Sequence, residues 1–147
     1  MSSWCYNDVV LLGPVEAIQA FKLAVCRSQR YLISAVKSCP FPSDLPSDDW
    51  AEWRLENWGM LWDLTEFNKS YDVWMRPIEH SISFQSVEFP PIPLFLMLSE
   101  KHPDVSISLR YLNAASSEFQ HVFIARGVVD EVSDPNELSW LDEVNYQ

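Results

Sequence analysis

The stretch Asn57-Trp58-Gly59-Met60-Leu61-Trp62-Asp63 is the point around which the chain is organised. It places two tryptophans four residues apart, around one of only three glycines in the chain. A glycine at such a point indicates backbone that a Cβ would obstruct, or a residue with positive φ. Two indoles at this spacing predict a shared packing site. We therefore expect a short helix to end here and to turn into a central strand.

The residues before this motif predict a helix with two unlike faces. A loop with three prolines covers residues 39–47, and Ser47 can cap the helix that follows it. Asp48 and Asp49 suit the first turn of that helix. We expect an aromatic face turned inward, with Trp50, Trp53 and Asn57, and an acidic face turned outward, with Glu52 and Glu56.

Apolar patterns predict the remaining elements of secondary structure. Before the motif we expect a strand at 6–12 and a helix that starts at Gly13-Pro14, with Val15, Ile18, Phe21 and Val25 on one face. After the motif we expect a strand at 61–67 and a hairpin of 72–76 with 80–87. A helix at 92–101 and strands at 105–111, 119–126 and 128–132 complete the chain.

This order of elements predicts an α+β domain of the ferredoxin-like type. Two helices would pack on one face of a largely antiparallel sheet, with a Trp-rich helical insertion at about residues 31–57 and an acidic tail at about 128–147. A chain of 147 residues suits one domain, 1–147. It can bury roughly 70% of its unfolded surface, so it needs neither disulfides nor a structural metal.

Composition predicts a cytoplasmic location. No run of about 18 apolar residues would cross a membrane. The start, Met1-Ser2-Ser3-Trp4, lacks the charged and apolar regions of a signal peptide. Three widely spaced cysteines, Cys5, Cys26 and Cys39, suit a reducing compartment with free thiols.

Negative charge is concentrated in two stretches. The formal charge is −11, and residues 42–66 and 127–147 together carry −12, which leaves the remainder close to neutral. Such a field repels nucleic acid and favours basic partners. The same acidity is also typical of proteins that only need to stay soluble. The acids that we expect to bind a partner are Asp44, Asp48, Asp49, Glu52, Glu56, Asp63, Glu66, Asp130, Glu131 and Asp134.

Several motifs support a family resemblance. The chain begins with Ser3-Trp4-Cys5-Tyr6-Asn7, an apolar strand and Gly13-Pro14, and Pro40-Phe41-Pro42 precedes the central motif. Phe84, Pro90-Pro91 and His102-Pro103-Asp104 follow it. Over about residues 3–126 the chain thereby resembles the mobile-element family typified by the plasmid protein YubB. The resemblance implies a ferredoxin-like domain, a phage, plasmid or genomic-island setting, and no reaction.

The resemblance also implies a structural motif of five residues: Trp4, Asn57, Trp58, Gly59 and Trp62. Two sites depart from the family pattern. Met60 and Leu61 stand in place of a polar-basic pair, and Glu88 stands where many members carry Trp. Both changes make this surface more acidic, which puts a shared ligand contact there in doubt.

No pattern of catalytic or metal-ligating residues is evident, so we expect no metal, cofactor or enzymatic activity. The three histidines, His80, His102 and His121, are far apart in sequence. Cys5 reads as a buried packing residue because no base stands beside it. The nucleophile-elbow and zinc-protease motifs are absent. The tryptophans could stack on bases, but without basic neighbours core packing is the more typical role.

These observations favour a non-enzymatic acidic binding protein of a phage or mobile element, whose partner is a host protein with a basic surface. In its sharpest form it inhibits a host nucleic-acid-handling or defence complex by phosphate mimicry. The alternative is a small-molecule or peptide-binding domain that uses a Trp-lined pocket. The identity of the partner and the oligomeric state are not encoded in these patterns.

Overall fold

Five strands form one antiparallel sheet. In the four longer strands, alternate residues along the strand face the core. The computed structural model describes residues 3–132. The sheet order is β2-β1-β3-β4-β5, so β1 pairs with both β2 and β3. The strands are β1 (Trp4–Leu12), β2 (Ser81–Val87), β3 (Ser106–Asn113), β4 (Glu118–Ala125) and β5 (Val128–Glu131). This sheet and the helices that cover it confirm the predicted α+β class.

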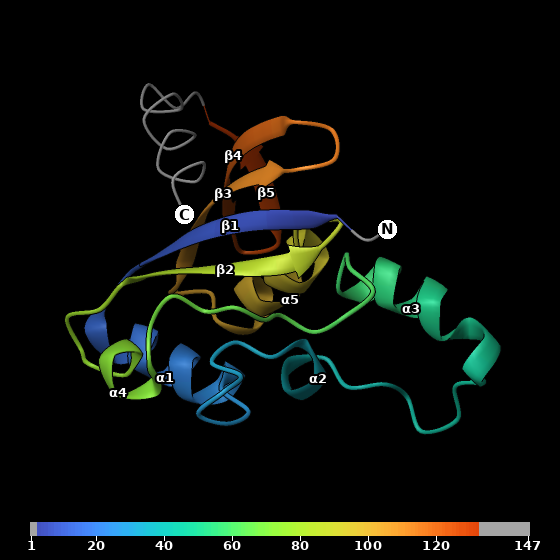
Figure 1. Ribbon diagram of the computed structural model, residues 1–147. Coiled ribbons are helices and arrows are strands. Elements are labelled where there is room, and N and C mark those ends of the chain that lie inside the picture. Colours follow the sequence, from blue (N-terminus) through green and yellow to red (C-terminus); the bar gives the residue numbers. More distant parts are fainter. Residues whose placement is uncertain (1–2, 133–147) are drawn as a thin grey trace.

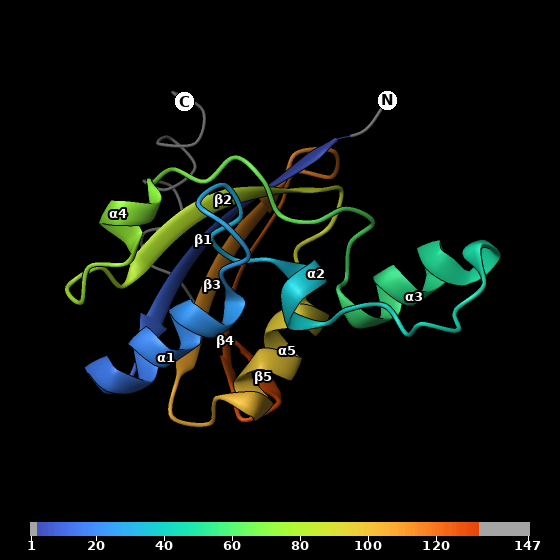
Figure 2. The same ribbon diagram turned by 90° about the horizontal axis from the view of Figure 1, so that it is seen from below.

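Two amphipathic helices cover one face of the sheet, as Figures 1 and 2 show. They are α1 (Val15–Val25) and α5 (Ile92–Lys101). The α1 helix buries Ile18, Phe21 and Val25 at helical spacing, whereas Val15 is exposed. The α5 helix buries Leu94, Phe95 and Leu98. These side chains join the inner residues of the strands in one hydrophobic core.

A long excursion of the chain between α1 and β2 carries four short helical elements. They are α2 (Ala35–Ser38), η1 (Ser47–Asp49), α3 (Trp50–Asn57) and α4 (Tyr71–Trp74). Figures 1 and 2 both show α3 at one end of the molecule, set off from the sheet and from α1. We call residues 42–57 the acidic arm, because they comprise a loop, η1 and α3 and carry five carboxylates.

Two predicted strands in this excursion are wrong. Residues 61–67 form no strand, because only Thr65 pairs with β2, through two backbone hydrogen bonds with Gln85. The hairpin strand predicted at 72–76 is instead the helix α4. The Ser70 hydroxyl accepts a hydrogen bond from the backbone N–H of Val73 at 3.3 Å and so caps this helix. A one-turn helix is too short to reveal itself by periodicity.

Among the described residues no helix combines the length and the apolar character needed to cross a membrane. Cys5, Cys26 and Cys39 are free thiols. Burial raises the pKa of the Cys5 thiol to about 12, so this thiol stays protonated and packs as a small apolar side chain.

Candidate functional site

The acidic arm presents five carboxylates to solvent: those of Asp44, Asp48, Asp49, Glu52 and Glu56, each of which is exposed. Within residues 3–132, the two ion pairs are Lys69–Glu79 and Arg110–Asp8, and neither involves the arm. Within the same range, none of these five carboxylates accepts a hydrogen bond either. The five carboxylates and Arg54 give the arm a formal charge of −4, and no ion pair within residues 3–132 involves it.

Apolar side chains are exposed on the same arm. Trp50 is 43% exposed and Leu55 is 41% exposed, and Trp62, just beyond the arm, is 57% exposed. Trp50 keeps its indole N–H bonded to the carbonyl of Leu45 at 3.3 Å. Aromatic side chains of this kind are enriched at the energetic centres of protein interfaces, where charged residues form the rim.

An aromatic cluster attaches the arm to the body of the protein. The Phe41 ring lies 4.8 Å from the Trp53 ring and 5.3 Å from the Trp58 ring. Trp58 is buried and donates its indole N–H to the carbonyl of Cys39 at 2.9 Å. The predicted division of α3 into an aromatic inner side and an acidic outer side is confirmed for Trp53 and for the two glutamates, but it is wrong for Trp50, which is exposed.

Gly59 explains how the end of α3 reaches α5. Its φ is +82°, and a Cβ at this position would lie 2.4 Å from Cδ of Pro93 and 3.1 Å from the carbonyl oxygen of Pro90. The glycine thus supplies both the positive φ and the close approach that the central motif predicted. Met60, the next residue, is fully buried.

The predicted shared packing site of Trp58 and Trp62 is present only in part, because Trp58 is buried and Trp62 is exposed. What the two rings share is Arg54, whose Cζ lies 5.9 Å from the Trp58 ring centroid and 5.5 Å from that of Trp62. Both rings also line a cavity of about 330 Å³. Trp4, the remaining tryptophan of the predicted motif, is 38% exposed at the start of β1 and pairs with Val87.

Asp63 differs from the other predicted partner-binding acids because its carboxylate bonds within the protein. One oxygen accepts from the Ser34 hydroxyl at 2.7 Å. The other accepts from the backbone N–H groups of Ala35, at 2.7 Å, and of Leu64, at 2.8 Å. Asp63 thereby holds the start of α2 against the segment that follows the arm, and it is removed from the expected docking surface.

The remaining predicted acids lie away from the arm. Glu66 is exposed beside Thr65, next to the β2 edge of the sheet. Asp130 and Glu131 are exposed on β5, at the opposite edge. Asp134 lies outside the described residues. Four strands separate Glu66 from Asp130 and Glu131, so these described acids do not meet across the sheet, and the candidate docking surface narrows to the arm.

Arg54 was not expected to matter, and it is the most unusual side chain of this region. Its Cζ lies within 6.0 Å of the ring centroids of Phe41, Trp50, Trp58 and Trp62. The sequence carries a signal for this, since Arg54 stands four residues from both Trp50 and Trp58, the spacing that brings helical side chains together.

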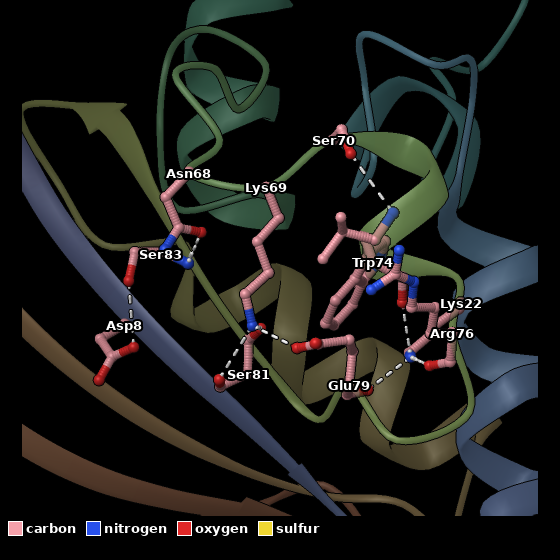
Figure 3. Close-up of polar contacts among 11 residues, drawn as sticks. Asp8, Lys22, Asn68, Lys69, Ser70, Trp74, Arg76, Glu79, Ser81 and Ser83 are labelled. Atoms are coloured by element: carbon pink, nitrogen blue, oxygen red, sulfur yellow. Dashed lines mark hydrogen bonds and ion pairs between the residues drawn. The ribbon is translucent and has the colours of Figure 1, made fainter.

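A second polar cluster lies beneath α1 and is structural. Figure 3 shows Glu79 between the ammonium groups of Lys22 and Lys69. Lys22 is fully buried and donates to the carbonyls of Trp74 at 2.7 Å, Arg76 at 3.1 Å and Glu79 at 2.5 Å. Burial lowers the pKa of Lys22. All three donors of its ammonium group are used, so this lysine joins α1 to the loop before β2.

The histidines and cysteines do not assemble into a metal site. Within the described part of the chain, no three His, Cys, Asp or Glu side chains are placed to hold a metal ion. His121 bonds to the Ser108 hydroxyl at 2.7 Å on the sheet face that α1 and α5 leave uncovered. His102 packs edge-on against Phe21, with ring centroids 5.2 Å apart.

Comparison with known proteins places the fold alone. No protein-family model matches the sequence, and a search of curated proteins found no match. A solved structure that is similar is the crystal structure of the protein api92 from Yersinia pseudotuberculosis, described by the family model DUF1281. The alignment has a TM-score of 0.50 and 11% identity, and it covers 91% of this chain and 99% of that one.

Proposed function

We propose that the protein is a non-enzymatic binding protein that presents the acidic arm to a basic surface of a partner protein. The observation that carries the proposal is the five exposed carboxylates of the arm, unpaired within residues 3–132, beside the exposed Trp50 and Leu55. Carboxylates would steer a basic partner and set the orientation of docking. The apolar side chains would contribute the buried centre of the interface.

The charge pattern supports a partner that normally binds nucleic acid. Grooves that hold DNA or RNA are lined with Lys and Arg, which a row of carboxylates can engage as phosphates do. Asp48, Glu52 and Glu56 stand four residues apart, so they form one line along η1 and α3. Inhibition of a host nucleic-acid-handling or defence complex by phosphate mimicry is the form of the function that we propose.

The resemblance to the YubB-type family supports a mobile-element setting for this activity, and the free thiols support a cytoplasmic one. We further propose that the fold is a ferredoxin-like arrangement whose second strand is reduced to the Thr65–Gln85 bridge. The element order β1, α1, bridge, β2, α5, β3 supports this reading, with β4 and β5 added at the far edge.

A matched pair of charge reversals tests the arm. The double variant E52K/E56K changes the charge of the arm, and D130K/E131K makes the same change on β5, at the edge of the sheet away from Glu66. We expect the wild-type protein, immobilised, to retain a DNA- or RNA-binding protein from bacterial host lysate at low salt. High salt or added double-stranded DNA should release this protein, because both compete with the carboxylates for its basic groove.

The identity of the retained protein is then confirmed with purified material, in which E52K/E56K should lose binding and D130K/E131K should keep it. Equal loss of binding in both variants would show that binding depends on the overall charge of the protein and not on the arm. Binding that ignores salt, or that E52K/E56K leaves intact, contradicts the proposal.

A further inference from the structure

The cavity beside the arm has the lining of a small-molecule site rather than of a packing gap. It measures about 330 Å³, which is within the usual range for ligand pockets. Its walls include the aromatic side chains of Tyr31, Phe41, Trp58 and Trp62 together with Arg54. Apolar and aromatic walls with a few polar groups are characteristic of such sites.

Arg54 has hydrogen-bond donors at this cavity that the described residues do not use. Its Nη1 donates to the carbonyl of Leu61 at 3.2 Å, while its Nε is buried and has no acceptor among the described residues. No carboxylate of the described chain forms an ion pair with its guanidinium. A guanidinium offers five N–H donors in a planar fork that matches carboxylate and phosphate oxygens. An unpaired cation of this kind favours an anionic group in the cavity.

Asp63 also lines the cavity, but its carboxylate bonds to other groups and forms no ion pair with Arg54. Both of its oxygens are engaged by the Ser34 hydroxyl and by backbone N–H groups. Beyond Tyr31 and Thr65 the lining continues into a second cavity of about 250 Å³, which the cations of Arg30 and Lys69 and the carboxylate of Glu66 border. Lys69 pairs with Glu79, and the described residues offer no partner to the guanidinium of Arg30.

Trp62 provides a flat wall with an open side. It is 57% exposed although it lies at the edge of a cavity and close to Arg54. Leaving an indole this exposed gives up the free energy that burying it would contribute. A planar ligand that stacks on the indole would recover that burial.

We propose that this cavity binds a small molecule in which a flat aromatic or heteroaromatic ring carries a phosphate or carboxylate group. The ring stacks on Trp62, and the anionic group accepts hydrogen bonds from the guanidinium of Arg54. The site is separate from the outer, acidic side of α3, so the proposal stands or falls independently of the partner-binding function.

Four probes dissect the ligand class, with binding measured by titration calorimetry on the full chain. Adenosine 5′-monophosphate and indole-3-carboxylate each join a ring to an anion, whereas adenosine lacks the anion and ribose 5-phosphate lacks the ring. We expect at least one of the first two to bind about tenfold or more tightly than the incomplete probes, because charged hydrogen bonds and stacking each contribute at this level. Which of the two binds distinguishes a phosphate source from a carboxylate source.

Three variants then place the ligand. R54Q removes the charge and retains an amide that can bond to Leu61, and W62A removes an exposed ring. Each should weaken binding about tenfold, whereas R126Q, which removes an exposed arginine in the turn between β4 and β5, should leave it unchanged. If R54Q fails to fold, W62A still tests the proposal, because Trp62 is exposed and its removal should not prevent folding.

Two results would overturn the proposal. One is that neither ring-bearing anion binds at millimolar concentration. The other is that W62A, or a folded R54Q, binds as tightly as the wild type.

Discussion

At the residue scale, Lys22 is a buried charged side chain that links α1 to the segment around α4 by hydrogen bonds. Sequence reasoning assigns a lysine in an amphipathic helix to solvent, yet this one is fully buried. Its Nζ lies 4.5 Å from the centroid of the Trp74 ring and bonds to three backbone carbonyls around α4. No sequence pattern announces this role, because the acceptors are main-chain atoms more than 50 positions away.

We predict that K22M lowers the free energy of unfolding by about 3 kcal/mol, as methionine fills the space but leaves three buried carbonyls without a donor. Urea denaturation followed by tryptophan fluorescence measures the change. K101M, at the exposed end of α5, is the matched control and should cost far less. Equal stability of K22M and the wild type would show that the three hydrogen bonds contribute little beyond the desolvation of the ammonium group.

At the scale of elements, long periodic segments were predictable and short ones were not. The helix predicted at 92–101 is α5, Ile92–Lys101, and the strands predicted at 105–111, 119–126 and 128–132 correspond to β3, β4 and β5. In α5, β3 and β4 one buried face imposes a clear period on the sequence, whereas β5 is short and has only Val129 partly buried. Residues 61–67 carry a similar apolar density, but their aromatic and aliphatic side chains serve the cavity and the core from irregular backbone.

The candidate site shows the same division. The acidic side of α3 followed from helical spacing alone, whereas the cavity depends on Tyr31, Phe41 and Trp62, which are distant in sequence and have no common pattern. Arg54 was the exception, since its neighbours at four-residue spacing are both tryptophans. Its position between the aromatic rings was not predicted, because a single basic residue within an acidic stretch is usually counted only toward the net charge.

The attachment of α3 gives a prediction at this scale. No residue of α3 is buried, so the helix depends on the ring of Phe41 against Trp50, Trp53 and Trp58. We predict that F41A raises amide hydrogen exchange throughout α3 at least tenfold while α1 and α5 stay protected, because the arm opens locally. F67A, which removes a ring that packs on Phe84, is the control and should leave exchange in α3 unchanged. Uniform loss of protection in F41A would mean that the arm and the body unfold together.

At the scale of the whole molecule, the acids of the arm and the described acids of β5, Asp130 and Glu131, belong to different parts of the fold. The arm leaves the body beyond one end of α5, and β5 closes the sheet at the edge away from β2, as Figure 1 shows. A net charge of −11 therefore does not describe one uniform field. Dispersed carboxylates are typical of proteins that need to stay in solution, whereas under the proposed function the partner recognises the local density on the arm. The two interpretations of the acidity, a solubilising charge and a partner-binding surface, can therefore apply to different parts of the molecule.

The junction of α5 with β3 makes the stability of the whole domain sensitive to pH. His102 ends α5 and packs on Phe21 of α1, and burial, together with the charge of Lys101, lowers its pKa below the usual 6.5. Well above pH 6.5 the imidazole is neutral in both the folded and the unfolded chain, so it has no effect on the pH dependence there. As the pH falls below 6.5, the unfolded chain takes up a proton first, and stability decreases until the folded-state pKa is passed.

We therefore predict that the free energy of unfolding falls more steeply between pH 7 and pH 5 for the wild type than for H102Q. Urea denaturation at half-unit steps of pH measures both curves. Their separation at pH 8, where histidines are uncharged, corrects for any change in packing that the glutamine causes. Parallel curves would show that protonating His102 carries no cost in the fold, and the acid sensitivity would then have to come from the carboxylates.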